Sequence, residues 1–358
     1  MKTLLFILGT RPEAIKLAPI ILEASNSKIF RLEVILSSQH PEMCLQTLST
    51  FGISPTIVLS GFENGQSLVS FSSKVLGEIA QINLPWKESI VIVQGDTTTA
   101  TMGAYAGFLM ESKVVHVEAG LRTYERDPFP EEMNRSLISK LADFHFCATD
   151  GNSQNLRTEG VLQNQIAIVG NTVTDAVNFF KVKRIVDKEK KSILITLHRR
   201  ENHKSVINET TKIISQLANE FDSGFEWKFI KHPNPIAQAG YDSDFKSNPN
   251  IRFLEPLPYP EMLAELSKSY LVLTDSGGFQ EESTYLGIPT LVLRKTTERP
   301  EAISSGCCEL IADPAKTLKT KTRDILTNEL LHQQMSHPSK IFGVGTSAKK
   351  ILDVLKTL

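Results

Sequence analysis

Residues 3–16 read TLLFILGTRPEAIK, and the order of residue types in this stretch decides the fold. A continuous apolar run comes first, which is typical of a strand that is buried on both faces of a parallel sheet. A turn with Gly9 follows, and Pro12 then suits the first turn of a helix. Because the same order of buried strand, turn and helix recurs along the chain, the sequence predicts an α/β, doubly wound fold.

Further apolar runs extend this pattern to both halves of the chain. The sequence predicts strands at residues 4–8, 32–36, 90–93, 114–117, 144–147, 193–196, 227–230, 270–273 and 290–293. A polar, charged stretch at residues 170–191 precedes a second alternating series, which indicates a second domain. We therefore expect one doubly wound domain over residues 1–170, another over residues 171–340, and a cleft between them. The amphipathic segment at about 341–358 is expected to pack back on the first domain.

The bulk composition excludes several classes of protein. A chain of 358 residues suits two domains, and a formal net charge of −1 gives no general attraction to nucleic acid or anionic lipid. The apolar run near the N-terminus is too short for a signal peptide, and no stretch approaches the length of a membrane span. The cysteines lack C-x-x-C spacing; they are Cys44, Cys147, Cys307 and Cys308. We expect a cytoplasmic protein without a metal site, a nucleic-acid partner or a membrane partner.

Charged residues follow the predicted strands of the first half. Ligands of open parallel sheets bind beyond the carboxyl ends of the strands. Arg11 and Lys16 lie close to a helix N-terminus, where anions are favoured. Asp96, Glu118 and Glu131 follow later strands and would place three carboxylates on one rim, although Asp96 also suits a simple helix cap. Crowded, partly buried carboxylates are a common source of general acids and bases with displaced pKa values.

The second half carries candidate anion ligands. His198 and Arg199 end a predicted strand and suit a phosphate contact or a proton transfer, and His232 follows the next strand. The turn at residues 276–278 reads Ser-Gly-Gly between a buried strand and a helical pattern, so its backbone N–H groups can approach a phosphate closely. The same turn is also explained by a need for positive φ. The other candidates here are Glu282, for ribose hydroxyls, and Arg299, for added positive charge.

Nine segments of the chain resemble the non-hydrolysing UDP-N-acetylglucosamine 2-epimerases. In chain order they are GTRPEAIKLAP (9–19), GDTTT (95–99), HVEAGLRT (116–123), PEEMNR (130–135), GNTVTDA (170–176), HRREN (198–202), HPNP (232–235), LTDSGGFQEE (273–282) and TERPEA (297–302). The resemblance covers nearly the whole chain. It implies two Rossmann-like domains that face each other across a cleft in the glycosyltransferase-B arrangement, and usually a homodimer.

The resemblance also implies an activity and a set of roles. The family epimerises UDP-N-acetylglucosamine reversibly at C2 to UDP-N-acetylmannosamine, by eliminating UDP to 2-acetamidoglucal and adding it back, without a metal or a redox cofactor. By this resemblance Asp96, Glu118 and Glu131 are the acid and base groups, in an order that stays open, and His198 assists the departing UDP. The expected substrate ligands are Arg11, Lys16, Arg199, His232, Ser276, Gly277, Gly278, Glu282 and Arg299.

Other functions remain open on these residues. A family member can act on a related UDP-sugar, such as a diacetamido-uronate. The hydrolysing relatives release free N-acetylmannosamine, and a glycosyltransferase of the same fold needs an acceptor pocket. A nucleotide-sugar sensor needs the diphosphate turn but not the carboxylates. The unchanged segments TRPEAIK and EAGLRT and the rim carboxylates favour the 2-epimerase.

Several features depart from the family pattern, and one is the loop after HRREN (198–202), which is short and lacks the usual glycines. Met262 stands where the family often has an aromatic residue that packs on uracil, and residues 338–345 replace the family's late N-P-Y-G-D-G segment. The last departure lies where many bacterial members bind a second UDP-N-acetylglucosamine as an activator. The residues that match this region are Gln39, His40 and Glu131, and those that depart are Pro41, Glu42 and Gly65. We therefore expect a nearly hyperbolic dependence of rate on substrate.

Overall fold

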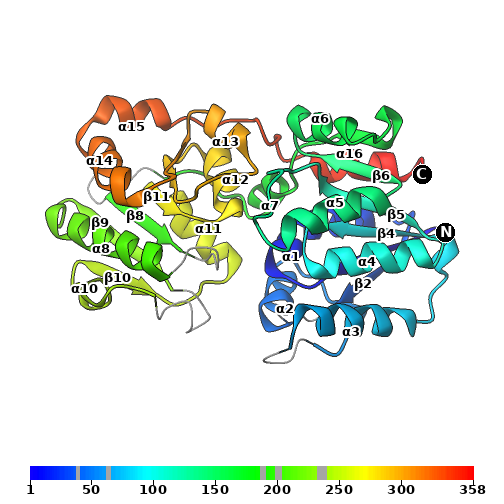
Figure 1. Cartoon of the computed structure of the whole chain (residues 1–358). Helices are drawn as coiled ribbons and strands as arrows, with labels where there is room; N and C mark the ends of the chain where they lie inside the picture. The colour runs from blue at the N-terminus through cyan, green and yellow to red at the C-terminus, as the bar shows by residue number, and fades with distance from the viewer. Residues whose placement is uncertain (38–40, 62–65, 186–190, 198–203, 232–239) are drawn as a thin grey trace. The chain divides into compact units, whose positions relative to one another are not determined.

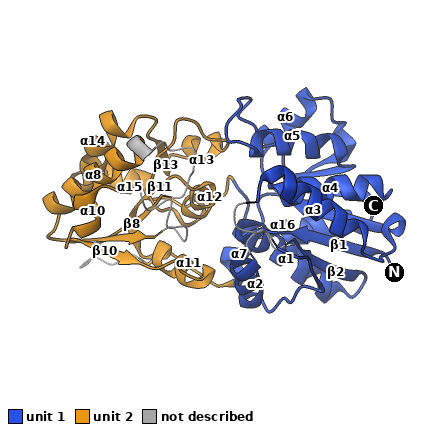
Figure 2. Ribbon diagram, turned by 60° about the horizontal axis from the view of Figure 1, so that its bottom comes forward, with its two compact units in different colours: residues 1–179, 342–358 blue, residues 180–341 orange. Residues whose placement is uncertain are grey.

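The computed structural model describes residues 1–37, 41–61, 66–185, 191–197, 204–231 and 240–358, and the structural statements below concern these residues. They form two compact units, one of residues 1–179 with 342–358 and the other of residues 180–341 (Figure 2). Each unit is built on one parallel sheet and its helices, so the predicted α/β fold is confirmed.

The first unit contains a seven-stranded sheet in the order β3-β2-β1-β4-β5-β6-β7. Its strands are β1 (Thr3–Leu8), β2 (Arg31–Leu36), β3 (Ile57–Val58), β4 (Ser89–Gln94), β5 (Lys113–Ala119), β6 (Phe144–Cys147) and β7 (Ile166–Ile168). β1 and β4 are buried along their whole length, as their apolar runs predict. The strand order reverses direction between β1 and β4, and such a switch point is where open α/β sheets bind ligands.

Two groups of helices cover this sheet (Figure 1). α3 (Leu68–Ala80), α4 (Thr98–Leu109) and α5 (Glu131–Leu141) pack side by side. In the other group, α1 (Arg11–Ser27) packs against three helices, α2 (Pro41–Thr50), α7 (Val173–Phe179) and α16 (Ser347–Leu355). α6 (Asp150–Thr158) lies beside β5, β6 and β7. Short 3₁₀ turns precede β4 and β7, at Trp86–Glu88 and Gln163–Gln165.

The second unit contains a six-stranded sheet in the order β10-β9-β8-β11-β12-β13. Its strands are β8 (Lys191–Thr196), β9 (Phe225–Ile230), β10 (Ile251–Leu254), β11 (Ser269–Thr274), β12 (Thr290–Val292) and β13 (Cys308–Leu310). Its helices are α8 (Lys204–Glu220), α10 (Ser243–Ser247), α11 (Tyr259–Ser267), α12 (Gly277–Leu286), α13 (Pro300–Ser304), α14 (Pro314–Thr327) and α15 (Glu329–Met335). Trp227 and Phe229 of β9 are fully buried in its hydrophobic core.

Every strand predicted from an apolar run is present, with bounds that differ by at most a few residues. The pattern missed four strands, β3, β7, β10 and β13, which end the two sheets or are too short to form a long apolar run. The division between the units falls after Phe179 and not at residue 170, because α7 packs against α1 and α16. The backbone N–H of Asn171 also donates to the carbonyl of Phe342, 2.7 Å away, within the same unit.

The C-terminal segment from Phe342 onward belongs to the first unit. Asp175 of α7 accepts hydrogen bonds from the backbone N–H groups of Ser347 and Ala348, at the start of α16. Ile351 and Leu355 of α16 are fully buried. Among the helices of the described ranges, none combines the length and the apolar character that a membrane crossing requires.

Candidate active site

Three neighbouring strands of the first sheet end at the edge that carries the predicted charged residues. β1, β4 and β5 are adjacent, and parallel strands end on the same side of a sheet. α1, which starts after β1, carries Arg11 at its first position and Lys16 in its second turn. Asp96 follows β4, and Glu118 is the penultimate residue of β5. Glu131 is the half-buried first residue of α5.

Glu118 lies at an irregularity of β5. The register between β5 and β6 shifts between Val117 and Ala119, and the φ angle of Glu118 is 64°. Residues other than glycine rarely adopt this left-handed conformation, and strained backbone of this kind is concentrated at functional sites. Because a bulge re-aims a side chain, the irregularity accounts for the direction that the Glu118 carboxylate takes.

The Glu118 carboxylate is held by three donors from three parts of the chain. Lys16 forms an ion pair with Oε1, and Gln94 at the end of β4 donates to Oε2. Asn171 donates from Nδ2 to Oε1 over 2.8 Å. The side chains of Lys16 and Glu118 are only 6% and 7% exposed, so this ion pair is buried. Lys16, which the sequence predicts as a diphosphate ligand, therefore has a carboxylate as its ion-pair partner.

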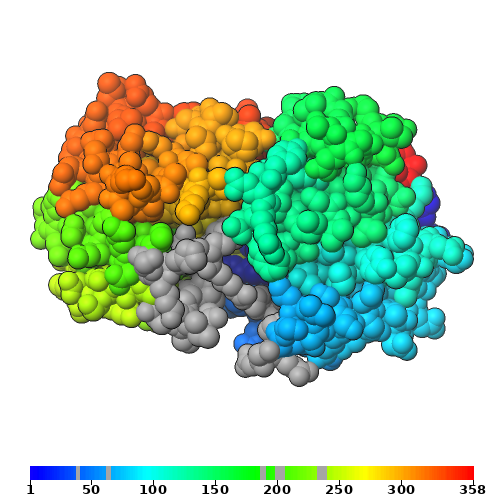
Figure 3. Space-filling view, in the orientation of Figure 1, coloured from blue at the N-terminus to red at the C-terminus, as the bar shows by residue number. Residues whose placement is uncertain are grey.

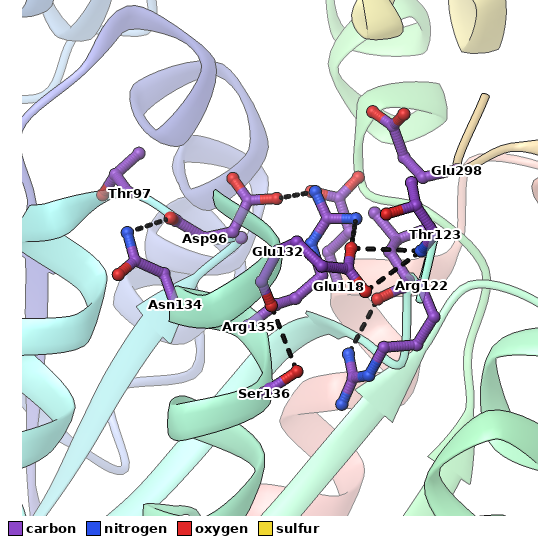
Figure 4. Close-up of polar contacts among 12 residues, drawn as sticks. Asp96, Thr97, Glu118, Arg122, Thr123, Glu132, Asn134, Arg135, Ser136 and Glu298 are labelled. Carbon is purple, nitrogen blue, oxygen red and sulfur yellow. Dashed lines mark hydrogen bonds and ion pairs between the residues drawn. The ribbon is translucent and has the colours of Figure 1, made fainter. Parts of the chain in front are cut away.

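Asp96 is anchored by α5 (Figure 4). Arg135 donates from Nη2 to the Asp96 carboxylate over 2.5 Å, and Asn134 donates to the Asp96 backbone carbonyl over 2.8 Å. Arg135 also contacts Glu132 over 3.1 Å, and the Glu132 carboxylate accepts the backbone N–H groups of the segment that leads to α5. The Asp96 side chain is 23% exposed while that of Arg135 is 3% exposed. The cation is thus buried, and the carboxylate that it fixes reaches solvent.

The Glu13 carboxylate contacts two of the turns that follow these strands. Glu13 is fully buried in α1, and one oxygen accepts hydrogen bonds from Gly9 N–H and from the backbone and hydroxyl of Thr10. The other oxygen contacts the Thr97 hydroxyl, 2.8 Å away, at the N-cap of α4. Burial raises the pKa of Glu13 to about 7, because desolvation outweighs these hydrogen bonds. Glu13 therefore joins the turn after β1 to the turn after β4.

His116 supports the turn that precedes Asp96. Its Nε2 lies 2.7 Å from the carbonyl oxygen of Gly95, and since a carbonyl can only accept, Nε2 carries the proton. Burial lowers the pKa of His116 to about 3, so the ring is neutral near pH 7. The residue therefore acts as a fixed, uncharged donor.

In the second unit, the turn after β11 starts α12, with Ser276 at the N-cap. Neither Gly277 nor Gly278 has a positive φ, so backbone conformation does not require glycine at either position. A Cβ on Gly277 would lie 2.6 Å from Nη1 of Arg299, whereas a Cβ on Gly278 would come no closer than 4.0 Å to the Ser276 hydroxyl. Gly277 is therefore needed for the close approach of a guanidinium group.

Arg299 belongs to a buried ionic network. Its Nε donates to Glu281 and its Nη1 to Glu298, each over 2.5 Å. Arg294 donates to the other oxygen of Glu298 over 2.7 Å. The Arg299 charge is thus balanced by two carboxylates while its guanidinium lies against the first residue of α12. Glu282, in the same helix, accepts a hydrogen bond from the Tyr259 hydroxyl over 2.9 Å.

A family model described as UDP-N-acetylglucosamine 2-epimerase matches residues 22–356. The chain belongs to this family. The UDP-N-acetylglucosamine 2-epimerase of Salmonella borreze is 38% identical to this chain over 376 residues, which cover 100% of this chain and 99% of the relative. That of Bacillus subtilis is 35% identical over 356 residues, with coverages of 98% and 93%.

Solved structures of epimerases have the same fold. The crystal structure of UDP-GlcNAc 2-epimerase from Neisseria meningitidis bound to UDP-GlcNAc matches with a TM-score of 0.94 and 34% identity, covering 100% of both chains. A co-structure of an S. aureus protein with UDP matches with a TM-score of 0.93 and 35% identity, covering 100% of this chain and 96% of that chain. The resemblance seen in the nine sequence segments is therefore confirmed.

Some predicted residues of this epimerase-family chain lie outside the described ranges. They are His198, Arg199 and His232 among the site residues, and Gln39, His40 and Gly65 in the predicted activator region. Met262, the predicted replacement for an aromatic residue on uracil, is buried in α11. No group of three or more His, Cys, Asp or Glu side chains in the described part of the chain is arranged to hold a metal ion.

Several site residues of this epimerase-family chain were not predicted individually. They are Glu13, Gln94, His116, Arg135 and Asn171. A signal was present for Gln94 and His116, since each is a polar residue in a mostly apolar, buried strand and such groups need a hydrogen-bond partner. Glu13 stands three residues after Thr10, which is the spacing of a capping box. Asn171 and Arg135 gave no signal beyond their place in the quoted segments.

Proposed function

We propose that this chain interconverts UDP-N-acetylglucosamine and UDP-N-acetylmannosamine by elimination and re-addition of UDP. UDP leaves C1 as a proton leaves C2, and UDP adds back to C1 after C2 has received a proton on its opposite face. The observation that carries the proposal is a pair of carboxylates, Glu118 and Asp96, on one sheet edge at the strand-order switch, each fixed by a buried cation. Membership of the epimerase family and the relatives whose structures hold UDP-GlcNAc or UDP support it.

The reaction needs acid and base groups on both faces of C2, because inversion removes a proton from one face and returns it to the other. Asp96, Glu118 and Glu131 are the proposed groups. Three donors to the Glu118 carboxylate favour its anionic form, which suits a base in one direction and, by microscopic reversibility, an acid in the other. Asp96 reaches solvent beside the same strands and can serve the second face.

The reaction also needs strong stabilisation of the leaving diphosphate, because the C2 proton is not α to a carbonyl and is barely acidic. Departure of UDP must therefore supply much of the driving force. We assign this role to Arg11, His198, Arg199 and the N-terminus of α12 at residues 276–278, where backbone N–H groups can meet phosphate oxygens. The remaining proposed substrate ligands are His232, Glu282 and Arg299. Lys16 then serves through its ion pair with Glu118.

We also propose that the chain acts in the cytoplasm as a homodimer, with UDP-GlcNAc and UDP as its ligands and without a metal or redox cofactor. Large apolar side chains are exposed on the adjacent helices α4 and α5, whose surfaces form part of the face in Figure 3. Phe108 and Leu109 of α4 are 54% and 55% exposed, and Met133 of α5 is 63% exposed. Tyr105 of α4 and Leu137 of α5 are exposed as well, and large apolar side chains exposed on neighbouring helices favour association. Sedimentation analysis should give a dimer that Phe108→Glu converts to monomer, and a monomeric wild type would contradict the assembly.

Proton NMR of UDP-N-acetylglucosamine with the pure chain in D2O tests the reaction. We expect an anomeric signal of UDP-N-acetylmannosamine, together with loss of the C2 proton signal of both sugars through deuterium incorporation. Free UDP with free sugar as the main product would instead identify a hydrolysing enzyme. An unchanged spectrum with demonstrated binding of the substrate would overturn the proposal and direct attention to another UDP-sugar or to a transferase.

A further inference from the structure

Asn171 connects the proposed acid/base carboxylate Glu118 to the C-terminal segment of the chain. The side chain of Asn171 is 3% exposed, and its Nδ2 donates to Glu118 Oε1 over 2.8 Å. Its Oδ1 accepts the backbone N–H of Val173 over 3.0 Å. Because only the amide oxygen can accept that N–H, the amide has one possible orientation and its NH2 group must face Glu118.

The backbone of Asn171 is fixed by the returning chain. Its N–H donates to the carbonyl of Phe342 over 2.7 Å, and its own carbonyl accepts the hydroxyl of Thr174 over 2.8 Å. Gly170 has a φ of 90°, and a Cβ there would lie 2.7 Å from the Ser347 hydroxyl and 3.0 Å from the Phe342 carbonyl oxygen. The segment at residues 342–347 therefore packs directly behind the residue that contacts Glu118.

We propose that Asn171 is a positioning residue, which fixes the direction and the charge of the Glu118 carboxylate and is itself held by the C-terminal return at residues 342–347. The effect on catalysis rests on the proposed function, whereas the effect on Glu118 does not. The charged or titratable groups that face Glu118 are Lys16 from α1 and the neutral His116 on its own strand. Asn171 and Gln94 contact the Glu118 carboxylate as uncharged donors.

Asn171→Asp separates positioning from a purely structural role. The Asp side chain has the same shape and keeps an oxygen for the Val173 N–H, so the hydrogen bond at the start of α7 is retained. It replaces the donor to Glu118 by a second carboxylate, and a like charge disfavours ionisation. Asn171→Ser gives an independent check, because its hydroxyl can still accept the Val173 N–H but is too short to reach Glu118.

The matched control is Asn178→Asp. Asn178 lies in the same helix and donates to the carbonyl of Val344 over 3.3 Å, so it contacts the same returning segment, but its side chain is exposed. This variant makes the same chemical change beside the C-terminal return and leaves the hydrogen bonds from Lys16, Gln94 and Asn171 to Glu118 in place. We expect wild-type behaviour in every measurement below.

The deciding measurement is the titration of Glu118 by carbon NMR of protein labelled at the glutamate carboxyl carbon, with the resonance assigned by its loss in Glu118→Gln. We expect the midpoint to rise by about one to two pH units in Asn171→Asp and by less in Asn171→Ser. An unchanged midpoint in both folded variants overturns the proposal, whatever their activity.

Kinetics complete the test. In Asn171→Asp we expect kcat with UDP-N-acetylglucosamine to fall about ten- to a hundredfold with little change in KM, and the acid limb of the kcat profile to move to higher pH. A wild-type enzyme without epimerase activity whose Glu118 midpoint still responds to Asn171→Asp would retain the inference and overturn the proposed function. An active wild type whose Glu118 midpoint does not respond to Asn171→Asp would retain the proposed function and overturn the inference.

Discussion

The carboxyl edges of the two sheets hold their charged groups in opposite ways. On the first sheet, buried cations fix carboxylates, since Lys16 pairs with Glu118 and Arg135 with Asp96. On the second sheet, buried carboxylates fix a cation, since Glu281 and Glu298 both pair with Arg299. The first arrangement presents oriented anions, which suits proton transfer. The second presents an oriented cation beside a helix N-terminus, which suits an anionic ligand.

In both regions the residue that holds its partner in place is buried and forms a close ion pair. Each ion pair therefore fixes the position of a charged group more than it stabilises the fold. A buried ion pair stabilises a fold little overall, but removal of one partner leaves an uncompensated charge. The comparison therefore predicts different losses for the two edges. Changes on the first sheet should impair turnover, and changes on the second should impair the binding of UDP.

The largest expected effect is on turnover. Glu118→Gln and Asp96→Asn should each lower kcat by about a hundred- to ten-thousandfold, because each removes a group proposed to transfer a proton, while affinity for UDP changes little. Steady-state kinetics and calorimetric titration with UDP measure the two effects. Glu111→Gln is the control, because Glu111 forms an exposed ion pair with Lys87. Near-wild-type kcat in both variants would break the assignment of the first sheet edge to proton transfer.

An intermediate effect is expected at the glycine pair of the second sheet edge. Gly277→Ala forces a Cβ to within 2.6 Å of Arg299, so we expect a loss of stability of about 1–3 kcal/mol and weaker binding of UDP. Gly278→Ala meets open space within the protein, so its melting temperature should be unchanged or higher. If phosphate oxygens of UDP approach the backbone at residues 276–278, the added methyl group of Gly278→Ala should weaken UDP binding about tenfold even though the fold is unaffected. Unaltered UDP affinity in Gly278→Ala would remove the turn from the proposed diphosphate site.

The sequence predicted the strands and the position of the charged residues better than it predicted their partners. Apolar runs are local, so β1, β4 and β11 could be recognised without knowledge of the fold. The contact of Asn171 with Glu118 joins residues far apart in the chain. It also depends on an irregularity in β5 that the residue pattern does not predict. Arg299 was predicted as a source of positive charge for the substrate, and its ion pairs with Glu281 and Glu298 could not be predicted, because the sequence does not show which carboxylates fold against it.

Glu13 provides the smallest and sharpest test, because it is a carboxylate of the first sheet edge whose hydrogen-bond partners, Gly9, Thr10 and Thr97, are all uncharged. Burial raises its pKa from 4.5 to about 7. Between these values the folded chain binds a proton that the unfolded chain has lost, so stability should fall as pH rises through this window and then level off above it. The loss is on the order of 3 kcal/mol.

Glu13→Gln should remove this pH dependence. An amide oxygen can accept the three hydrogen bonds from Gly9 and Thr10, and the amide NH2 can donate to the Thr97 hydroxyl. The variant should therefore match the wild type in thermal stability near pH 5 and exceed it near pH 8. If the wild type were instead more stable than Glu13→Gln at pH 8, Glu13 would be ionised in the folded chain, as proposed for Glu118. A carboxylate at this edge would then not need a buried cation in order to be ionised.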